Sequence, residues 1–208
     1  MNYYIMSDYK INESPKHYDD SGVTDTYQDE VYKFAKTILN EENLNIVVDI
    51  GCGSGYKLIK YFNNNLTIGI ETEPCISFLR KIYPDKKWVD SGECEKSFPN
   101  FNQTCDLIIC ADLIEHMIDP TELLKYINKF QYKYLIISTP DRYILKNKNK
   151  NDGLKSWHGP PLNECHVREW EYNEFTKLLN DYFFIIQGFH AKIQTDCMIF
   201  LCKPKQII

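Results

Sequence analysis

The sequence predicts one α/β domain built on a doubly wound, mostly parallel sheet. The chain has 208 residues, enough for one full core and too few for two ordinary domains. From residue 45 onward, short apolar runs alternate with segments of helical periodicity, which is the pattern of strand–helix–strand units. Only a short polar segment separates the last two apolar runs, so we expect them to form a C-terminal antiparallel strand pair.

The first element we expect is an amphipathic helix. Apolar residues recur at helical spacing between Thr24 and Asn40, behind a Thr/Asp cap. This helix belongs to an N-terminal cap segment, residues 1–44, that precedes the core at residues 45–208. Both parts are expected to form one domain over residues 1–208.

The core then alternates between strands and helices. Central parallel strands are covered on both faces, so continuous runs of Val, Ile and Leu indicate them. Such runs predict strands at residues 45–50, 66–71, 86–90, 105–112, 134–139, 183–191 and 197–204. Helical patterns lie at residues 55–63, 73–83, 119–130 and 168–181. This order is Rossmann-like, and ligands of such sheets bind outside the carboxyl ends of the strands.

Charge and cysteine content limit the classes of partner. The net charge is −5, so no global attraction to nucleic acid or to an anionic membrane is expected. No run of about 18 apolar residues is present, and residues 1–10 lack the pattern of a secretory signal. The eight cysteines include no C-x-x-C pair, which is typical of buried thiols in a reducing compartment. We therefore expect a cytoplasmic protein without membrane insertion or a nucleic-acid partner, as a monomer or homodimer.

A glycine-rich turn follows the first core strand in "VVDIGCGSGY". Asp49 ends the strand, and Gly51, Gly53 and Gly55 follow at alternate positions, a spacing that fits neither a P-loop nor a G-x-G-x-x-G dinucleotide turn. Alternate glycines leave the backbone open to a ligand. Glu71 ends the second strand, where a carboxylate can accept two hydrogen bonds from a ribose diol.

These segments resemble the class I S-adenosylmethionine-dependent methyltransferases. Besides the glycine turn, "GIETEP", "CDLIICADLIEHMIDP" and "YLIISTPDR" are similar to that family's ribose acid, fourth strand and fifth strand, in the same order. The resemblance implies S-adenosylmethionine as cofactor, with its methionine part at Asp49 and Gly51, its ribose at Glu71 and its adenine at Asp90 or Ser91. The cofactor residues that it implies are Gln28, Asp49, Gly51, Gly53, Gly55, Glu71, Thr72, Asp90, Ser91, Ala111 and Asp112. A dinucleotide-type protein whose glycines only allow close packing is the alternative.

Acidic and imidazole side chains follow the fourth strand. Methylation of a hydroxyl needs a base or a metal to lower the pKa of that hydroxyl. Asp112, Glu115 and His116 are spaced to project from one face of a helical turn, and His158, Glu164 and His166 lie in a later Gly/Pro-rich loop. Carboxylates and imidazoles of this kind form a plausible shell for Mg²⁺ or Mn²⁺ that leaves positions open for two vicinal hydroxyls.

The pattern D-x-x-E-H with a later H-x-x-E-W resembles the Hen-type small-RNA 2′-O-methyltransferases and the quinone-ring O-methyltransferases. This resemblance implies a divalent metal held by Asp112, Glu115, His116 and His166, with Asp112 in place of the Hen-type Glu. The alternative is a metal-free site in which Glu and His satisfy backbone groups near a helix start. The candidate catalytic imidazoles are then His166, His116 and His158, with His166 as the first choice of general base.

Both ends of the chain also resemble bacterial methyltransferases of surface-polysaccharide and glycan synthesis, through "HYDDSGVTDTYQDEVYKFA" and "GPPLNECHVREW". The implied acceptor is a sugar hydroxyl, free or nucleotide-linked, with Tyr18, Tyr27 and Gln28 as lid contacts. A basic run at residues 142–155 could meet the diphosphate of a nucleotide sugar or the backbone of an RNA end, or be a solvated loop. We therefore expect a sugar O-methyltransferase. The alternatives are an RNA 3′-end 2′-O-methyltransferase, a small-molecule N-methyltransferase and a non-catalytic cofactor-binding protein.

Overall fold

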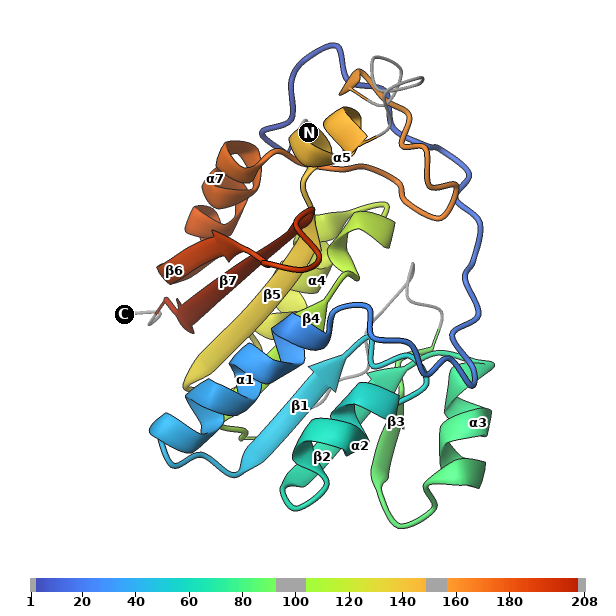
Figure 1. The fold of residues 1–208 in the computed structure, drawn as a ribbon, viewed down its shortest axis with the longest axis vertical. Helices are drawn as coiled ribbons and strands as arrows, with labels where there is room; N and C mark the ends of the chain where they lie inside the picture. Colours follow the sequence, from blue (N-terminus) through green and yellow to red (C-terminus); the bar gives the residue numbers. More distant parts are fainter. Residues whose placement is uncertain (1–2, 93–103, 149–156, 206–208) are drawn as a thin grey trace.

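The computed structural model describes residues 3–92, 104–148 and 157–205. Across these ranges the strands form one sheet in the order β3-β2-β1-β4-β5-β7-β6 (Figure 1). Strands β1 to β5 pair in parallel, while β7 runs antiparallel to both β5 and β6. The strands are β1 Ile46–Ile50, β2 Leu66–Glu71, β3 Lys87–Asp90, β4 Leu107–Ala111, β5 Tyr134–Pro140, β6 Phe183–His190 and β7 Cys197–Pro204. The predicted mostly parallel α/β sheet with a C-terminal antiparallel pair is confirmed.

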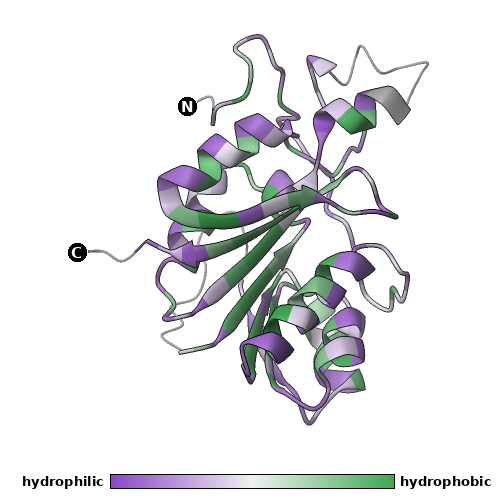
Figure 2. Ribbon diagram, turned by 60° about the vertical axis from the view of Figure 1, so that its left-hand side comes forward, coloured by the Kyte–Doolittle hydropathy of each residue, from purple (hydrophilic) through white to green (hydrophobic). Residues whose placement is uncertain are grey.

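Helices cover both faces of this sheet. One apolar cluster joins α1 (Asp29–Glu41), α2 (Tyr56–Phe62) and α3 (Cys75–Ile82) to one face of the central strands. A second cluster joins α4 (Pro120–Ile127) and α7 (Tyr172–Tyr182) to the other face. Hydrophobic colour accordingly runs along the strands, and the helices alternate between hydrophilic and hydrophobic residues (Figure 2). Burial on both faces explains why the central strands are continuous apolar runs.

Helix α1 begins at Asp29, several residues later than the sequence pattern predicts. Gln28 precedes it in a left-handed conformation with φ 62°, which turns the chain sharply into the helix. Asp29 and Glu30 lie in the first turn, where negative charge favours a helix N-terminus. The Glu30 carboxylate also accepts the backbone N–H groups of residues 192–194 at 2.7–3.1 Å, so the start of α1 is fixed to the β6–β7 turn.

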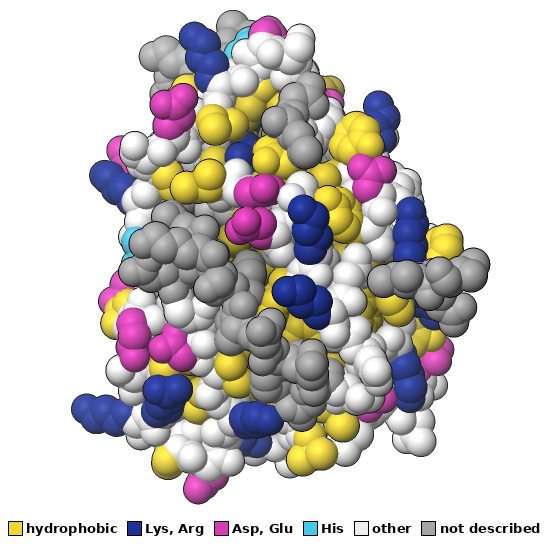
Figure 3. Space-filling view, turned by 180° about the vertical axis from the view of Figure 1, so that it is seen from behind, with side chains coloured by type: hydrophobic (Ala, Val, Ile, Leu, Met, Phe, Trp, Pro, Cys, Tyr) yellow, Lys and Arg dark blue, Asp and Glu magenta, His cyan; other side chains and the backbone are white. Residues whose placement is uncertain are grey.

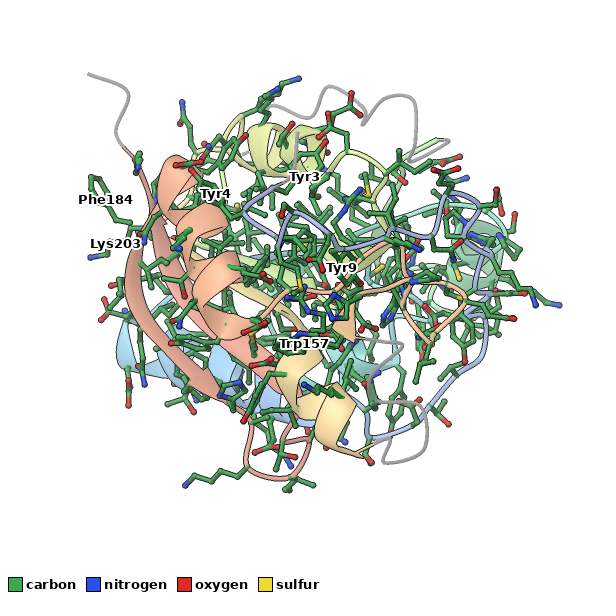
Figure 4. All side chains as sticks on the ribbon, turned by 90° about the horizontal axis from the view of Figure 1, so that it is seen from above. Tyr3, Tyr4, Tyr9, Trp157, Phe184 and Lys203 are labelled. Atoms are coloured by element: carbon green, nitrogen blue, oxygen red, sulfur yellow. The ribbon has the colours of Figure 1, made fainter. Side chains whose placement is uncertain are left out.

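Residues 3–28 form an extended strap without helix or strand, which runs beside the carboxyl ends of the parallel strands (Figure 1). Two buried arginines anchor its first part. The Arg142 guanidinium lies 4.8 Å from the Tyr9 ring centre and 5.2 Å from that of Trp157. Arg168 lies 4.8 Å from the Tyr3 ring centre and donates to the carbonyls of residues 117 and 118. Seen from above, Tyr3, Tyr9 and Trp157 lie over the interior, whereas Phe184 and Lys203 project at the outer edge (Figure 4).

The first residue of the basic run has a different role from those considered for the run. Arg142, the first residue of α5 (Arg142–Lys148), is fully buried and ion-paired with Glu171 and Glu174 at 3.0 and 2.9 Å. It is therefore not available to a diphosphate. The Lys146 ammonium lies 4.1 Å from the Trp157 ring centre. The remaining lysines of the run, Lys148 by its side chain and Lys150 and Lys155 entirely, lie outside the described residues.

Cysteine placement agrees with small buried thiols. Six of the described cysteines are buried, Cys165 is partly exposed and Cys94 lies outside the described residues. Among the helices that the structure describes, none has the length and apolar character needed to cross a membrane.

Candidate active site

A large cavity lies at the carboxyl ends of the parallel strands. Its volume is about 1290 Å³, above the range of about 300–1,000 Å³ that is typical of small-molecule sites. Residues that follow β1 to β5 line one side, and the strap between Pro15 and Gln28 lines another. The loop from Leu162 to His166 also lines the cavity. The cavity has room for a cofactor and a second molecule.

The three glycines of the turn have two different roles. Gly51 and Gly53 line the cavity with φ values of 76° and 52°, a backbone conformation that favours glycine. Gly55 does not line it. A Cβ atom on Gly55 would lie 2.6 Å from the Leu79 Cδ2 atom and 2.9 Å from the Trp88 ring, so this glycine lets α2 start close to its neighbours. The expected cofactor contact of Gly55 is therefore replaced by a packing role.

Asp49 lies beneath the turn and not on the cavity wall. The Tyr32 hydroxyl donates to its Oδ2 atom at 2.9 Å, while Oδ1 has no hydrogen-bond partner among the described residues. Burial raises the pKa of Asp49 to about 7, against which the Tyr32 hydrogen bond acts. An unpaired buried carboxylate oxygen suits a cationic or hydrogen-bond-donating group at the turn.

Glu71 is held by the backbone on both of its oxygens. Oε2 accepts the Gly53 N–H at 2.8 Å and Oε1 accepts the Thr72 N–H at 2.9 Å. Burial raises the pKa of Glu71, and these backbone hydrogen bonds oppose the shift. Each carboxylate oxygen has a second lone pair, so Glu71, which lines the cavity with Thr72, retains the capacity to accept from a diol.

Of the two residues expected at the adenine edge, only Asp90 lines the cavity. Its carboxylate accepts the Gly92 N–H at 2.7 Å. Ser91 is buried and donates its backbone N–H to the Glu71 carbonyl at 2.8 Å, so it connects the ends of β2 and β3. Ser91 does not line the cavity, so the structure does not place it for the expected contact with the cofactor.

Glu115, His116 and His166 come together at the other end of the cavity. One ligand-type atom from each lies within 4.8 Å of the other two. Glu115 is fully buried in the short helix η1 (Ile114–His116), and its Oε2 atom accepts the Thr139 hydroxyl at 2.9 Å. Its Oε1 atom has no partner among the described residues. Burial, and to a lesser degree Asp112, raise the pKa of Glu115 well above its usual value.

Hydrogen bonds fix both imidazoles. His116 Nδ1 lies 2.8 Å from the Cys165 carbonyl, and His166 Nδ1 lies 2.8 Å from Glu169 Oε1. Because both partners are acceptors, each Nδ1 carries the hydrogen and each Nε2 is left as an acceptor, the arrangement usual for metal-binding histidines. Burial, followed by the nearby His166, lowers the pKa of His116 to about 4. The rings meet edge to face with 4.9 Å between centres.

Two of the predicted acceptor-side residues lie elsewhere. Asp112, at φ 47°, is outside the three-residue group, because its Oδ1 atom accepts the Ser138 hydroxyl on β5 at 2.7 Å. His158 does not line the cavity, and its ring, 49% exposed, pairs with Asp8 at 2.8 Å. Three of the four residues predicted for the metal shell therefore lie close together, and His158 is not placed to act as a base in the cavity.

Comparison with known proteins agrees with this geometry. The sequence pattern of a methyltransferase domain matches residues 20–184. The chain belongs to this methyltransferase family. It is an S-adenosylmethionine-dependent methyltransferase, as its family and fold show. Comparison with curated proteins gives no match.

Solved structures share the methyltransferase fold at low sequence identity. PH0226 from Pyrococcus horikoshii matches with a TM-score of 0.64 at 16% identity, over 98% of each chain. An S-adenosylmethionine-dependent methyltransferase from Clostridium acetobutylicum matches with a TM-score of 0.63 at 15% identity, over 85% of this chain and 91% of its own. The small RNA methyltransferase HEN1 matches with a TM-score of 0.62 at 18% identity, over 86% of this chain and 25% of its own.

The cofactor end of the cavity fits S-adenosylmethionine. The open backbone at Gly51 and Gly53 and the fixed Glu71 carboxylate suit its methionine and ribose groups. Asp49, with its unpaired Oδ1 atom, lies buried beneath this turn and off the cavity wall. When bound, the cofactor supplies a methyl group on a positively charged sulfur. The enzyme's residues then have to orient an acceptor atom toward that methyl group and keep the acceptor in its reactive form.

The strap supplies the lid side of the cavity in the methyltransferase. Tyr18, Tyr27 and Gln28, the three expected lid residues, all line it. The backbone N–H of Gln28 donates to Gln194 Oε1 at 2.8 Å, and its side chain lies close to Asp112, where it lowers the pKa of that buried carboxyl against the larger effect of burial. Burial and the nearby Asp112 raise the pKa of Tyr27.

Sequence reasoning missed two residues near the end of the cavity that holds Glu115, His116 and His166, which we call the acceptor end. Glu169 follows His166 by three residues, a helical-turn spacing that could have indicated the pair. His17 lies on the strap and lines the cavity. No spacing in the sequence relates His17 to His116 or His166, because the strap reaches them only through tertiary contacts.

Proposed function

We propose that this methyltransferase transfers the methyl group to the oxygen of a sugar hydroxyl, assisted by a divalent ion at Glu115, His116 and His166. The observation that carries the proposal is the cluster of these three side chains in the same cavity as the cofactor turn. The unpaired buried Glu115 oxygen and the Nε2 acceptor of His116 are suited to hold a cation. His166 Nε2 lies 2.9 Å from the Asn163 side-chain amide, which an ion would have to displace.

Methylation of a hydroxyl would require the chemistry that this cluster could supply. A neutral hydroxyl is a weak nucleophile, and coordination to a cation lowers its pKa. Glu115 and the two histidines would hold the ion, and its open positions would take hydroxyl oxygens of the acceptor. A nitrogen acceptor becomes reactive once a base removes any ammonium proton and needs no cation beside it, so the cluster favours oxygen.

The rim of the cavity favours a neutral, hydroxyl-rich acceptor. Polar side chains that can exchange hydrogen bonds with sugar hydroxyls line it at the acceptor end, namely Lys16, His17, Asn163 and Glu164. Arg142 is buried away from it. These features support a sugar, and they offer little to the diphosphate of a nucleotide sugar.

RNA is the second candidate acceptor, favoured by the Hen-type spacing and by the fold shared with HEN1. The net charge of −5 opposes it. On the face opposite the view of Figure 1, lysines and arginines lie interspersed with carboxylates (Figure 3). Binding to a short single-stranded RNA that weakens steeply between 50 and 200 mM salt would support RNA over a sugar.

The test is methyl transfer from radiolabelled S-adenosylmethionine to a panel of monosaccharides and polysaccharides, with Mg²⁺, Mn²⁺ or EDTA. We expect a labelled methyl ether on a sugar, at least about 100-fold less product with EDTA, and recovery on adding Mn²⁺. Glu115→Gln should reproduce the EDTA result while S-adenosylmethionine still binds. Full activity in EDTA would contradict metal assistance, and labelling of amines alone would contradict O-methylation.

A further inference from the structure

The strap brings a carboxylate to the cofactor end of the cavity. Asp20 lines this cavity together with Gly53 and Glu71. A Cβ atom on Gly53 would lie 3.1 Å from the Asp20 Cβ atom and 3.2 Å from its Oδ2 atom. Asp20 therefore occupies the space that a side chain at position 53 would fill, and the glycine lets the strap approach the turn this closely.

Hydrogen bonds hold this part of the strap in place. The Val23 backbone N–H donates to the Asp20 carbonyl at 3.0 Å, which closes a turn. The Ser54 hydroxyl donates to the Val23 carbonyl, so the glycine-rich segment itself anchors the strap. On the other side, the Ser21 hydroxyl donates to the Cys75 sulfur at 3.6 Å, at the start of α3. The backbone of Asp20 is thus fixed between the glycine turn and α3.

The Asp20 carboxylate has no donor among the described residues. Neither of its oxygens accepts a hydrogen bond or joins an ion pair there. Lys57, which also lines the cavity, pairs instead with Asp25 at 3.3 Å. Burial raises the pKa of Asp20, and the charge of Lys57 opposes this shift. A partly buried carboxylate without a donor favours a ligand that supplies one.

Asp20 lies on the ribose side of the glycine turn. Glu71, the carboxylate suited to the ribose, accepts the Gly53 N–H at 2.8 Å, so Asp20 and Glu71 both border Gly53. At Gly51, on the methionine side, a Cβ atom would instead meet Leu113 at 3.0 Å. Two carboxylates at one glycine repel a phosphate and can accept from hydroxyl groups, so this end of the cavity suits a nucleoside without phosphate.

We propose that Asp20 accepts a hydrogen bond from a ribose hydroxyl of bound S-adenosylmethionine and so, together with Glu71, closes the strap over the cofactor. A hydrogen bond to a carboxylate is stronger than one to a neutral acceptor, which gives the contact weight in binding. The strap between Pro15 and Gln28 lines one side of the cavity, so cofactor binding should slow hydrogen exchange in residues 15–28. This inference depends neither on the methyl acceptor nor on a metal ion.

The experiment measures binding of S-adenosylhomocysteine and 5′-methylthioadenosine to the full chain by calorimetry. The second ligand keeps the adenine and the ribose but lacks the amino-acid part. Asp20→Ala should weaken binding of both ligands by about 10- to 100-fold, the loss expected for a hydrogen bond to a charged group. Asp20→Asn, which keeps an acceptor oxygen without the charge, should lose less. Its matched control is Asp19→Asn on the same strap, which should bind as the wild type does because Asp19 does not line the cavity.

Ligands that lack one hydroxyl identify the contact. With either the 2′-deoxy or the 3′-deoxy form of 5′-methylthioadenosine, wild type and Asp20→Ala should bind equally, because the group that Asp20 would accept from is gone. An Asp20→Ala loss that is the same for both deoxy forms as for the intact ribose would overturn the ribose contact.

The remaining outcomes are also decisive. If Asp20→Ala weakens binding of S-adenosylhomocysteine but not of 5′-methylthioadenosine, Asp20 contacts the amino-acid part and the ribose assignment is wrong. Wild-type affinity of Asp20→Ala for both ligands would show that Asp20 does not touch the cofactor. Hydrogen exchange in residues 15–28 should slow with S-adenosylhomocysteine in the wild type and less in Asp20→Ala, and equal slowing would contradict closure through Asp20. An unchanged Tm without ligand shows that each variant is folded.

Discussion

Single residues in this methyltransferase show how burial adjusts chemistry. Asp49, Glu71 and Glu115 are carboxyls whose pKa values burial raises, each with a donor that opposes the shift. Burial acts in the other direction on His116, which stays neutral and therefore able to bind a cation. In and beneath one cavity, burial thus favours the protonated form of three acids and the neutral form of an imidazole.

Asp49 should make stability depend on pH. Burial raises its pKa from 3.8 to about 7 in the folded protein, so the folded state binds this proton more tightly than the unfolded state. The stabilisation is fully present below about pH 4 and is lost as the pH rises through about 7. We expect the Tm of the cofactor-free enzyme to fall less between pH 5 and 8 in Asp49→Asn than in the wild type. Thermal denaturation in a buffer series measures both slopes, and equal slopes would contradict the raised pKa.

Glu169 should act through His166. Its Oε1 atom accepts the hydrogen on His166 Nδ1, which orients the ring and leaves Nε2 as an acceptor, 2.9 Å from the Asn163 side-chain amide. Glu169→Ala removes the acceptor, and we expect Mn²⁺ affinity and turnover to fall by about 10- to 100-fold. Glu169→Gln keeps an acceptor oxygen and is the matched control, with a smaller loss. Equal losses in the two variants, measured by calorimetry, would show that the charge and not the hydrogen bond matters.

At the scale of elements, periodicity and continuous apolar runs were sufficient to predict the strands and the helices α1, α2, α3, α4 and α7, but not the short helices η1 and α5. Both signals arise from burial: β4 has every residue buried, and α1 buries one face through Val31, Ala35 and Leu39. Sequence also located the site, because parallel strands end at the same edge of a sheet. It did not separate the glycines that meet a ligand from Gly55, since that distinction depends on Leu79 and Trp88, which are brought to it by the fold.

Gly53 and Gly55 should therefore respond differently to the same substitution. A Cβ atom at Gly55 would lie 2.6 Å from Leu79, and φ is 69°, so Gly55→Ala should lower the free energy of unfolding by more than about 1 kcal/mol. At Gly53 the nearest atom would be Cβ of Asp20 at 3.1 Å, at the cavity wall. Gly53→Ala should weaken S-adenosylmethionine binding with a smaller loss of stability. Urea unfolding and calorimetry compare the pair, and an equal loss of stability would contradict the division of roles.

At the scale of the whole molecule, the strap joins the two ends of the chain around the cavity. Its first part docks on Arg142 and Arg168, its middle on the loop that carries His166, and its end on the β6–β7 turn through α1. No local pattern predicts this path. Arg142 lies in a run of charged residues that is typical of solvated loops. Its burial is explained by contacts that the sequence does not show, with the rings of Tyr9 and Trp157 and with the carboxylates of Glu171 and Glu174.

Arg142 should therefore be important for the stability of the whole molecule. Its guanidinium donates to the Glu169 carbonyl at 2.8 Å and to Glu171 and Glu174, and Glu174 also accepts the Met6 N–H of the strap. Arg142→Met leaves the two carboxylates without their counter-charge, so we expect the free energy of unfolding to fall by about 3–5 kcal/mol. Arg142→Lys should recover only part of this, because an ammonium cannot make the same set of planar contacts. Lys146→Met, a nearby lysine against the same Trp157 ring, should change stability by less than about 1 kcal/mol. If Arg142→Met unfolds at the wild-type urea concentration and only raises KM for a phosphorylated acceptor, then Arg142 binds substrate, and the strap is held by its other contacts.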